Sequence, residues 1–392
     1  MTVAGSSVKS SIPVARPWMD EQEAAAARRA ILSGWVTQGP EVAAFEQEFA
    51  HAVGARHACA VSSCTTALHL ALAALGVGAD DDVITVSHSF IATTNAIRYC
   101  GAIPVLVDIE AGTFNIDPAL VEAAIGPRTK AIIAVHQIGM PCDLRALTAI
   151  AARHHVPLIE DAACAVGSEI EWEGGWQRIG QPHGDIACFS FHPRKLLSTG
   201  DGGMLTTGNS ELDQRFRLLR QHGMSIPDAV RHASDQVIFE EYPVAGYNYR
   251  MTDIQAAIGR EQLKRLPAIV ARRRELAARY DAGLRSIDGV VVPREPAWAR
   301  SNWQSYAVRI GAWIEQRTFM QRMLDAGIAT RRGVMNVHRE RAYPAGTWRA
   351  GSSLERSEEA QDTAVILPLF HQLTEDDQDR VIDTVSQIIR DW

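Results

Sequence analysis

The sequence lacks the patterns that mark several large classes of protein. Its six cysteines are scattered and include no C-x-x-C pair, which disfavours a zinc site or a disulfide scaffold. The net charge is −7 and no dense lysine or arginine run occurs, so nucleic acid is not expected as a partner. No apolar stretch reaches membrane-spanning length, and residues 1–17 contain no apolar signal core. We therefore expect a cytoplasmic protein without a bound metal and without a membrane contact.

The chain is also free of internal repeats and low-complexity segments, and its 392 residues can bury a large core. Apolar runs alternate with helical patterns, which is typical of an α/β fold with a mostly parallel sheet flanked by helices. Seven strands are predicted, at 58–61, 83–86, 104–107, 131–135, 157–159, 186–189 and 204–206. We expect a large domain over residues 1–250 and a smaller C-terminal α+β domain over residues 251–392.

Two segments near the predicted boundary are harder to interpret. Residues 210–248 show no clear periodicity, and this favours a lid or a subunit contact rather than regular structure. Residues 252–286 follow a long helical pattern that contains Pro267, where we expect an interruption.

Polar side chains with complementary chemistry follow two of the predicted strands. Asp161 comes after the apolar run that ends at Ile159, while Ser190 ends the next run and Lys195 stands five positions later. A carboxylate, a lysine and a hydroxyl at this spacing suit pyridoxal phosphate. The carboxylate would hold the ring nitrogen protonated, the lysine would form a Schiff base, and the hydroxyl would bind a phosphate oxygen. Each residue alone is more often a helix cap or a solvated charge.

A second element upstream is suited to a phosphate group. Residues 61–72 read as a strand end, a turn of small residues and a helix that starts near Thr66. A helix N-terminus offers unpaired N–H groups and a positive partial charge, although an ordinary capped helix has the same pattern. No G-x-G-x-x-G motif follows any strand, so the turn indicates a single phosphate rather than a dinucleotide. Parallel strands would bring this turn and Lys195 to one edge of the sheet.

These motifs resemble a known family, the DegT/DnrJ/StrS sugar aminotransferases, which are pyridoxal phosphate enzymes of fold type I. The likeness runs nearly from end to end. The motifs that carry it are SSCTTALHLAL, HSFIATTNAI, GAIPVLVDI, VHQIGMPCDL, IEDAACAVG, GDIACFSFHPRKLLSTGDGGML, GYNYRMTDIQAAIG and LPLF. The resemblance implies a fold-type-I transferase.

The resemblance also implies roles at matching positions. Lys195 would bind the cofactor covalently and move the proton, Asp161 would pair with the ring nitrogen, and Phe90 would stack on the ring. Residues implied at the phosphate or beside the cofactor are Cys64, Thr65, Thr66, Cys164, Ser190 and Asn248. Asn248 would come from the other subunit of a homodimer with shared active sites.

Several positions depart from the family pattern. Cys164 replaces a glutamine that supports the ring oxygen, Cys64 replaces a glycine of the phosphate turn, and HQIG (136–139) replaces HLYG, which removes a tyrosine. The small domain differs around 301–306 and 331–338. Candidate substrate residues are Arg250, Gln304, Arg331 and His338.

The resemblance predicts an aminotransferase that moves an amino group from glutamate or glutamine to a keto-sugar, most simply a nucleotide-linked one. Transfer to a keto-cyclitol or another carbocycle is the first alternative. A sugar dehydratase of the same fold is disfavoured, because known dehydratases replace the lysine by histidine and Lys195 is present. A non-catalytic regulator that binds pyridoxal phosphate would need a DNA-binding module, and none is visible.

Overall fold

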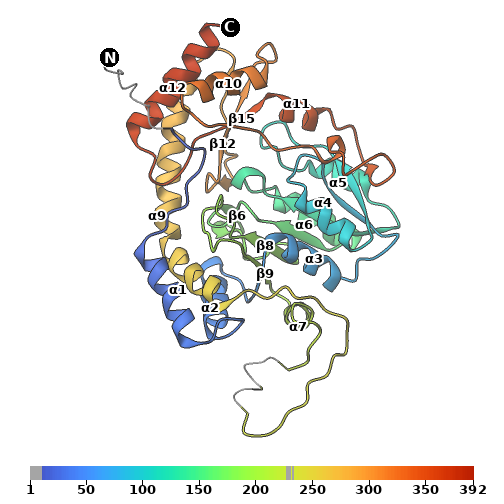
Figure 1. Ribbon diagram of the computed structural model, residues 1–392. Coiled ribbons are helices and arrows are strands. Elements are labelled where there is room, and N and C mark those ends of the chain that lie inside the picture. The colour runs from blue at the N-terminus through green and yellow to red at the C-terminus, as the bar shows by residue number, and fades with distance from the viewer. Residues whose placement is uncertain (1–10, 227–230, 232–233) are drawn as a thin grey trace.

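The central sheet of the protein has eight strands in the order β1-β9-β8-β5-β4-β2-β3-β14. We describe residues 11–226, 231 and 234–392 from a computed structural model (Figure 1). The strands are β1 (His57–Val61), β2 (Asp82–Val86), β3 (Ile103–Val107), β4 (Thr129–Val135), β5 (Leu158–Asp161), β8 (Ile186–Ser190), β9 (Gly203–Thr207) and β14 (Arg349–Ala350). All seven predicted strands are present. The two-residue β14 adds an eighth strand beside β3.

Strand direction explains where the polar groups gather. Strands β3, β2, β4, β5 and β8 run parallel, whereas β9 lies antiparallel between β8 and β1. The carboxyl ends of β2, β4, β5 and β8 therefore share one edge. Side chains alternate between the two faces, as in β4, where Ile132 and Ala134 join one core and Ala131 and Ile133 join the other. Apolar side chains on both faces require a helical layer on each side.

Helices form these two layers. One face packs against α2 (Pro40–Val53), α5 (Pro118–Ala124), α6 (Leu144–His154) and the first half of α9 (Asp253–Leu284). The other face packs against α3 (Cys64–Ala74), α4 (Ala92–Tyr99) and α7 (Ser210–Leu219). Figure 1 shows α3, α4 and α7 beside the sheet in these positions. The layers leave the carboxyl edge of the sheet open to a second part of the chain.

Helix α7 corrects the expectation that residues 210–248 contain no regular element. Asn209 caps the helix by accepting hydrogen bonds from the N–H groups of Glu211 and Leu212. The apolar face consists of a few side chains among many charged ones, and Phe216 and Leu219 are buried against the sheet. So short an apolar face is easily overlooked in a sequence. The tertiary contact stabilises the helix more than its own periodicity does.

Helix α9 runs from Asp253 to Leu284 without the interruption expected at Pro267. A proline inside a helix removes one backbone hydrogen bond and usually kinks the chain. Here the first half of the helix packs on α1 (Glu21–Ser33) and α2, and the second half packs on α12 (Glu375–Arg390). Packing at both ends keeps the two halves in one helix.

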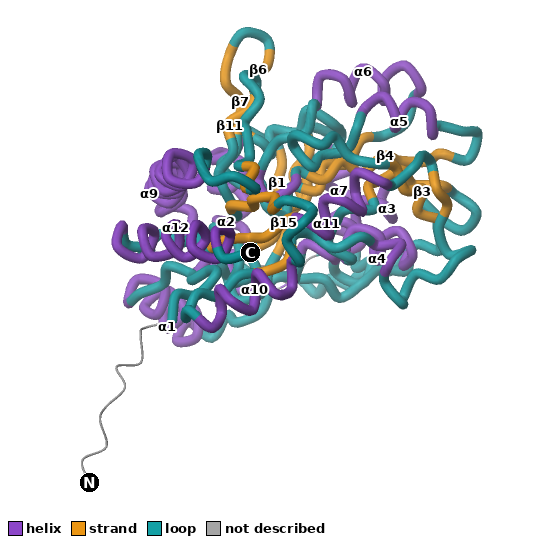
Figure 2. The backbone as a smooth tube through the Cα atoms, turned by 90° about the horizontal axis from the view of Figure 1, so that it is seen from above, coloured by secondary structure: helices purple, strands orange, loops and turns teal. Residues whose placement is uncertain are grey.

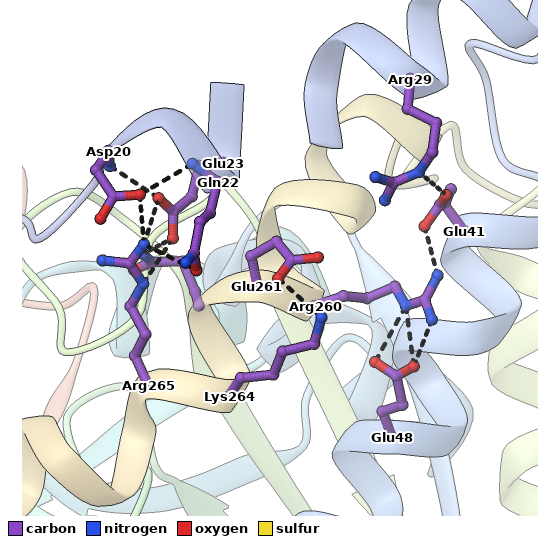
Figure 3. A network of polar contacts seen from close by, with 11 residues as sticks. Asp20, Gln22, Glu23, Arg29, Glu41, Glu48, Arg260, Glu261, Lys264 and Arg265 are labelled. Carbon is purple, nitrogen blue, oxygen red and sulfur yellow. Dashed lines mark hydrogen bonds and ion pairs between the residues drawn. The ribbon is translucent and has the colours of Figure 1, made fainter. Parts of the chain in front are cut away.

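Charged side chains fasten α1 and α2 to α9 (Figure 3). Arg265 on α9 donates to Asp20, the N-cap of α1, at 2.7 Å, and to Glu23 at 3.1 Å. One turn earlier, Arg260 donates to Glu41 at 2.7 Å and to Glu48 at 2.6 Å, both on α2. Because Arg265 is only 8% exposed, its ion pairs are screened less than surface pairs. The network holds α1 and α2 against the first half of α9.

A smaller four-stranded antiparallel sheet in the order β10-β12-β15-β13 follows α9. Its core is separate from those of the large sheet and includes side chains from α9, α10 and α12. The remaining elements are β6 (Glu169–Trp172), β7 (Gly175–Arg178), β10 (Val290–Val291), β11 (Ala299–Arg300), β12 (Tyr306–Ile310), α10 (Gln316–Asp325), β13 (Arg331–Arg332), α11 (Glu355–Thr363) and β15 (Ala364–Leu367). Strands β6, β7 and β11 form a third sheet that projects from the body (Figure 2).

The chain crosses between the large and small sheets more than once. Ile12 bridges to Ile328 beside the small sheet, and β14 returns from the C-terminal region to the edge of the large sheet. The domain boundary near residue 250 stays a prediction. Among the described helices, none combines the length and the apolar character needed to cross a membrane.

Candidate active site

A cavity of about 320 Å³ opens at the carboxyl edge of the large sheet and is closed on one side by the small sheet. It contains most of the residues that the sequence predicts. Those that line it are Cys64, Thr65, Phe90, Asp161, Cys164, Ser190, Lys195, Gln304 and Arg331. Thr66, Asn248, Arg250 and His338 are outside this lining. Groups separated by more than 250 residues in the sequence therefore meet in one place.

Asp161 is the last residue of β5 and is 5% exposed. Its Oδ2 accepts a hydrogen bond from Thr93 Oγ1 at 2.8 Å, and its Oδ1 accepts one from the N–H of Ala163 at 3.2 Å. Within the described residues the carboxylate has no ion-pair partner. Burial raises its pKa, although the two hydrogen bonds and the nearby Lys195 act in the opposite direction. A buried carboxylate of this kind suits a ligand that brings its own N–H cation.

Lys195 lies in the loop after β8 and lines the cavity. Its Nζ donates to Cys164 Sγ at 3.0 Å. Burial lowers the pKa of this amine, but the attraction of Cys164, Cys64 and Asp161 outweighs burial and raises it overall. The lysine thus stands beside a sulfur and near the buried carboxylate, inside the cavity rather than in solvent.

Gln304 fixes the backbone on both sides of Lys195. Its Nε2 donates to the carbonyl of Arg194 at 2.6 Å, and its Oε1 accepts from the N–H of Leu196 at 3.1 Å. Both ends of the amide are therefore occupied by the lysine loop. The predicted contact between Gln304 and substrate stays a prediction, while the observed contacts position Lys195.

Two buried residues that the sequence analysis did not single out support the site. Thr93 on α4 orients Asp161, as described above. Asn302 donates from Nδ2 to the carbonyls of Cys164 and Val166 at 2.8 Å each, and its Oδ1 accepts from the N–H of Gln304 at 2.8 Å. It joins the cysteine loop to the residue that holds Lys195. Thr93 lies within the family motif HSFIATTNAI, whereas Asn302 lies in the segment 301–306 that differs from the family pattern, and neither spacing indicates a role.

The other end of the cavity is formed by the N-terminus of α3. Ser63 caps the helix by accepting from the N–H of Thr66 at 3.1 Å. The N–H groups of Cys64 and Thr65 have no acceptor among the described residues, and Ser190 lies nearby at the end of β8. Free N–H groups and a hydroxyl suit a phosphate. Thr66, by contrast, already uses its N–H in the cap.

The helix also explains why Cys64 can replace a glycine. Helix α3 begins at Cys64, two residues before the start expected near Thr66. The backbone at Cys64 is helical, which any L-residue adopts without strain. The substitution therefore leaves the phosphate turn intact.

Gly203 on β9 allows this turn to lie against the sheet. A Cβ atom at Gly203 would lie 2.4 Å from the carbonyl carbon and oxygen of Ser63 and 2.7 Å from the nitrogen of Cys64. Because these are backbone atoms, a side chain could be accommodated only by moving the N-terminus of α3. The glycine is thus required by close packing beside the predicted phosphate position.

We expect Gly203→Ala to weaken cofactor binding about tenfold or more and to destabilise the fold by about 1–3 kcal/mol. Titration of the cofactor-free protein and a thermal melt measure the two effects. Gly208→Ala is the matched control, because a Cβ at Gly208 meets no atom within 4 Å. Equal cofactor affinity in both variants would contradict the proposed position of the phosphate.

Part of the cavity wall is apolar. Ile138, Val334 and Met335 line it, with Ile366 from the small sheet. Ile138 has a φ of 59°, a left-handed conformation that is strained for a β-branched residue. It stands where the family tyrosine would be, next to Gly139. The surrounding fold holds this strained residue at the cavity wall.

Three predicted residues lie away from the cavity of the described chain. Asn248 is exposed and pairs with Gln221, and Arg250 bridges to Val61. His338, in the short helix η2 (Val337–Arg339), contacts Ser87 Oγ at 2.6 Å and Glu358 at 3.0 Å. These contacts give His338 a structural place between strand β2 and helix α11. Roles for all three in substrate or cofactor binding stay predictions.

The α/β sheet with a buried carboxylate, a lysine and a free helix N-terminus at one edge defines a pyridoxal-phosphate-dependent aminotransferase of fold type I. Comparison with known proteins agrees. The chain belongs to the DegT/DnrJ/EryC1/StrS aminotransferase family, whose model matches residues 17–386. This confirms the predicted family, fold class, enzyme class and cofactor.

Individual relatives are similar over their whole length. The spore coat polysaccharide biosynthesis protein SpsC of Bacillus subtilis (strain 168) is 38% identical over 383 residues, which are 97% of each chain. The aminotransferase TlmJ from Streptoalloteichus hindustanus is 36% identical, with a TM-score of 0.88 over 97% of this chain and 99% of that one. The PLP-form of the putative sugar aminotransferase Spr1654 from Streptococcus pneumoniae is 26% identical, with a TM-score of 0.89 and the same coverage.

Proposed function

We propose that this aminotransferase moves an amino group from glutamate or glutamine to the ketone carbon of a sugar that is linked to a nucleoside diphosphate. Its membership of a sugar aminotransferase family supports the sugar. The observation that carries the proposal is the meeting of Lys195, Asp161 and the N-terminus of α3 in one cavity. The free cysteines among the described residues suit a reducing cytoplasm.

Each end of the cavity has a distinct task in this proposal. Pyridoxal phosphate, when bound, supplies an aldehyde that takes up the amino group and a ring that acts as an electron sink. Lys195 Nζ would attach the cofactor and then transfer the proton at the substrate carbon. Asp161 would keep the ring nitrogen protonated, and Thr93 would hold the carboxylate in place. Phe90, which is 56% exposed, has a free face on which the ring could stack.

Two arginines at the cavity support a phosphate-bearing acceptor. Arg194 and Arg331 are exposed and line the cavity, and neither guanidinium forms an ion pair with a described residue. Arginine donates to phosphate oxygens in a fork of parallel N–H groups. A keto-cyclitol without phosphate would leave both cations unused, although the apolar wall at Ile138 would admit a carbocycle.

A panel of acceptors tests this proposal. The enzyme is first charged with an amino donor, and the aminated cofactor is then followed spectroscopically as keto-sugar nucleotides, free keto-sugars and keto-cyclitols are added. We expect rapid loss of the aminated form with a keto-sugar nucleotide. A response to cyclitols alone would overturn the assignment of the acceptor, and comparison of glutamate with glutamine identifies the donor.

The site is proposed to be shared between two copies of the chain. Asn248 is exposed, pairs with Gln221, and does not line the cavity of its own chain. Before it, the described residues from 234 run away from the body (Figure 1) and expose Val237 and Phe239 at 86% and 87%. Apolar side chains on such an extended segment suit a contact with a second subunit. A two-fold dimer would then place Asn248 at its partner's phosphate.

Subunit exchange tests the shared site. Lys195→Ala and Asn248→Ala are mixed under conditions that allow the subunits to exchange. A heterodimer would contain one site with both defects and one site with neither, so we expect up to half of the wild-type activity per heterodimer. A mixture no more active than the separate variants, despite proven exchange, would place Asn248 within its own site or outside catalysis.

A further inference from the structure

The contact between Cys164 and Lys195 has a chemical consequence beyond cofactor binding. The Nζ atom of Lys195 lies 3.0 Å from Cys164 Sγ, and both side chains line the cavity. Among the described residues, no other cysteine has a hydrogen bond with a lysine amine. Burial raises the pKa of Cys59 to about 12 and that of Cys100 to about 11, and it also raises the pKa values of Cys64, Cys142 and Cys188. Buried thiols of this kind are poorly reactive.

The contact is built into the fold. Asn302 holds the carbonyl of Cys164 at 2.8 Å, and Gln304 holds the backbone on both sides of Lys195. Asn302 in turn accepts from the N–H of Gln304. The sulfur and the nitrogen are therefore positioned by two neighbouring residues of one segment. A pair fixed in this way is oriented for reaction before any reagent arrives.

We propose that Cys164 and Lys195 form a reversible nitrogen–sulfur cross-link when a peroxide enters the cavity. The bond would remove the amine that attaches the cofactor, and reduction by a thiol would restore it. The effect on the cofactor rests on the proposed role of Lys195, whereas the bond itself requires only the observed contact.

Two balanced steps form the bond. The Cys164 sulfur attacks one oxygen of hydrogen peroxide, the O–O bond breaks, and the products are a sulfenic acid and water. Sulfur is oxidised by two electrons and peroxide is reduced. The neutral amine of Lys195 then attacks the same sulfur, the S–O bond breaks, and hydroxide leaves with the amine proton as water. Sulfenic acids condense with nitrogen in this way elsewhere in proteins.

The second step needs a free amine at Lys195, because only an amine without a cofactor attached can attack the sulfur. When the cofactor is attached to Lys195, no free amine is present. The cross-link should thus form only while the lysine is free.

The test compares full-length protein with and without pyridoxal phosphate. Each sample is treated with hydrogen peroxide, alkylated, digested and examined by mass spectrometry. We expect a species in which the Cys164 and Lys195 peptides are joined with the loss of two hydrogen atoms, formed about tenfold or more faster without the cofactor. Dithiothreitol should reverse it and restore cofactor binding.

Variants separate this bond from other oxidations. Cys64→Ser excludes a disulfide between Cys64 and Cys164 and should retain the cross-link, as should the control Cys100→Ser, whereas Cys164→Ser should lack it. A Cys64–Cys164 disulfide, or a sulfinic acid without any joined peptide, would overturn the proposal. Equal rates with and without cofactor would support the bond but contradict the attachment of the cofactor at Lys195, so the two failures are distinguishable.

Discussion

Lys195→Ala is expected to reduce transamination to background and to remove the visible absorbance that appears when pyridoxal phosphate is bound. The fold should survive, because the lysine loop is held through its backbone by Gln304 rather than by the lysine side chain. If Lys195 has its proposed role, the cavity without Nζ would have neither the attachment point nor the group that moves the proton. Absorbance spectra and turnover with an amino donor measure both losses.

Lys130→Ala is a suitable control, because Lys130 is exposed near the start of β4. The cavity lies at the opposite, carboxyl end of the strands. This variant should keep wild-type turnover and spectrum. Normal turnover in Lys195→Ala would contradict the whole assignment of the site. Loss of circular dichroism would instead indicate that the variant fails to fold, and Lys195→Arg, which preserves charge and volume, would then replace it.

Asp161→Asn is expected to lower the rate about a hundredfold or more, because a neutral amide cannot stabilise the protonated ring nitrogen by a charge-assisted pair. The effect should fall mainly on the rate, since Thr93 can still donate to the amide oxygen and only the longer 3.2 Å bond from the N–H of Ala163 loses its acceptor. Single-turnover measurements with an amino donor isolate this step. An effect below about tenfold would mean that another acid holds the ring.

The same variant should be more stable than wild type without the cofactor. Burial raises the pKa of Asp161 in the folded state above the value of 3.8 in an unfolded chain. For an acid, a raised pKa in the folded state means that ionisation destabilises the fold. The free energy of unfolding therefore decreases as the pH rises above about 4. Asparagine has no such cost, so its cofactor-free melting temperature should exceed that of wild type at pH 7. The increase on adding pyridoxal phosphate should be smaller in the variant.

Thermal melts at pH 4 and pH 7, with and without cofactor, separate these effects. The difference between the cofactor-free proteins should shrink toward pH 4, because the destabilisation caused by ionisation of Asp161 accumulates only as the pH rises above the unfolded-state pKa of 3.8. A variant less stable than wild type at pH 7 without cofactor would contradict this, and would mean that the nearby Lys195 or a cation from solvent already compensates the carboxylate.

Much of the fold could be predicted because the large sheet is buried on both faces. Strands such as β4 and β8 are continuous apolar runs bounded by polar residues, and such runs are visible in a sequence. Helix α7 and the continuity of α9 through Pro267 depend instead on tertiary packing. The two-residue strand β14 has no pattern of its own, since it exists only through its pairing with β3.

The site could be predicted in part for a similar reason. Asp161, Ser190 and Lys195 follow strand ends at short spacing, and parallel strands bring such positions together. Asn302 lies more than 100 residues from the Cys164 loop that it holds, and Gln304 lies more than 100 residues from the lysine loop, so their roles arise from hydrogen bonds between distant segments. Asn248 and Arg250 do not line the cavity of their own chain, and the proposed dimer would be needed to bring Asn248 to a site.

The covalent attachment of the cofactor tests the account most directly. Sodium borohydride reduces the bond between pyridoxal phosphate and a lysine to a stable amine, which can be located by digestion and mass spectrometry. The sequence has only four lysines, Lys9, Lys130, Lys195 and Lys264, so the assignment is unambiguous. We predict that the label lies on the peptide containing Lys195 and on no other. Label on Lys130 or Lys264, or spectroscopically bound cofactor without any labelled lysine, would contradict the account.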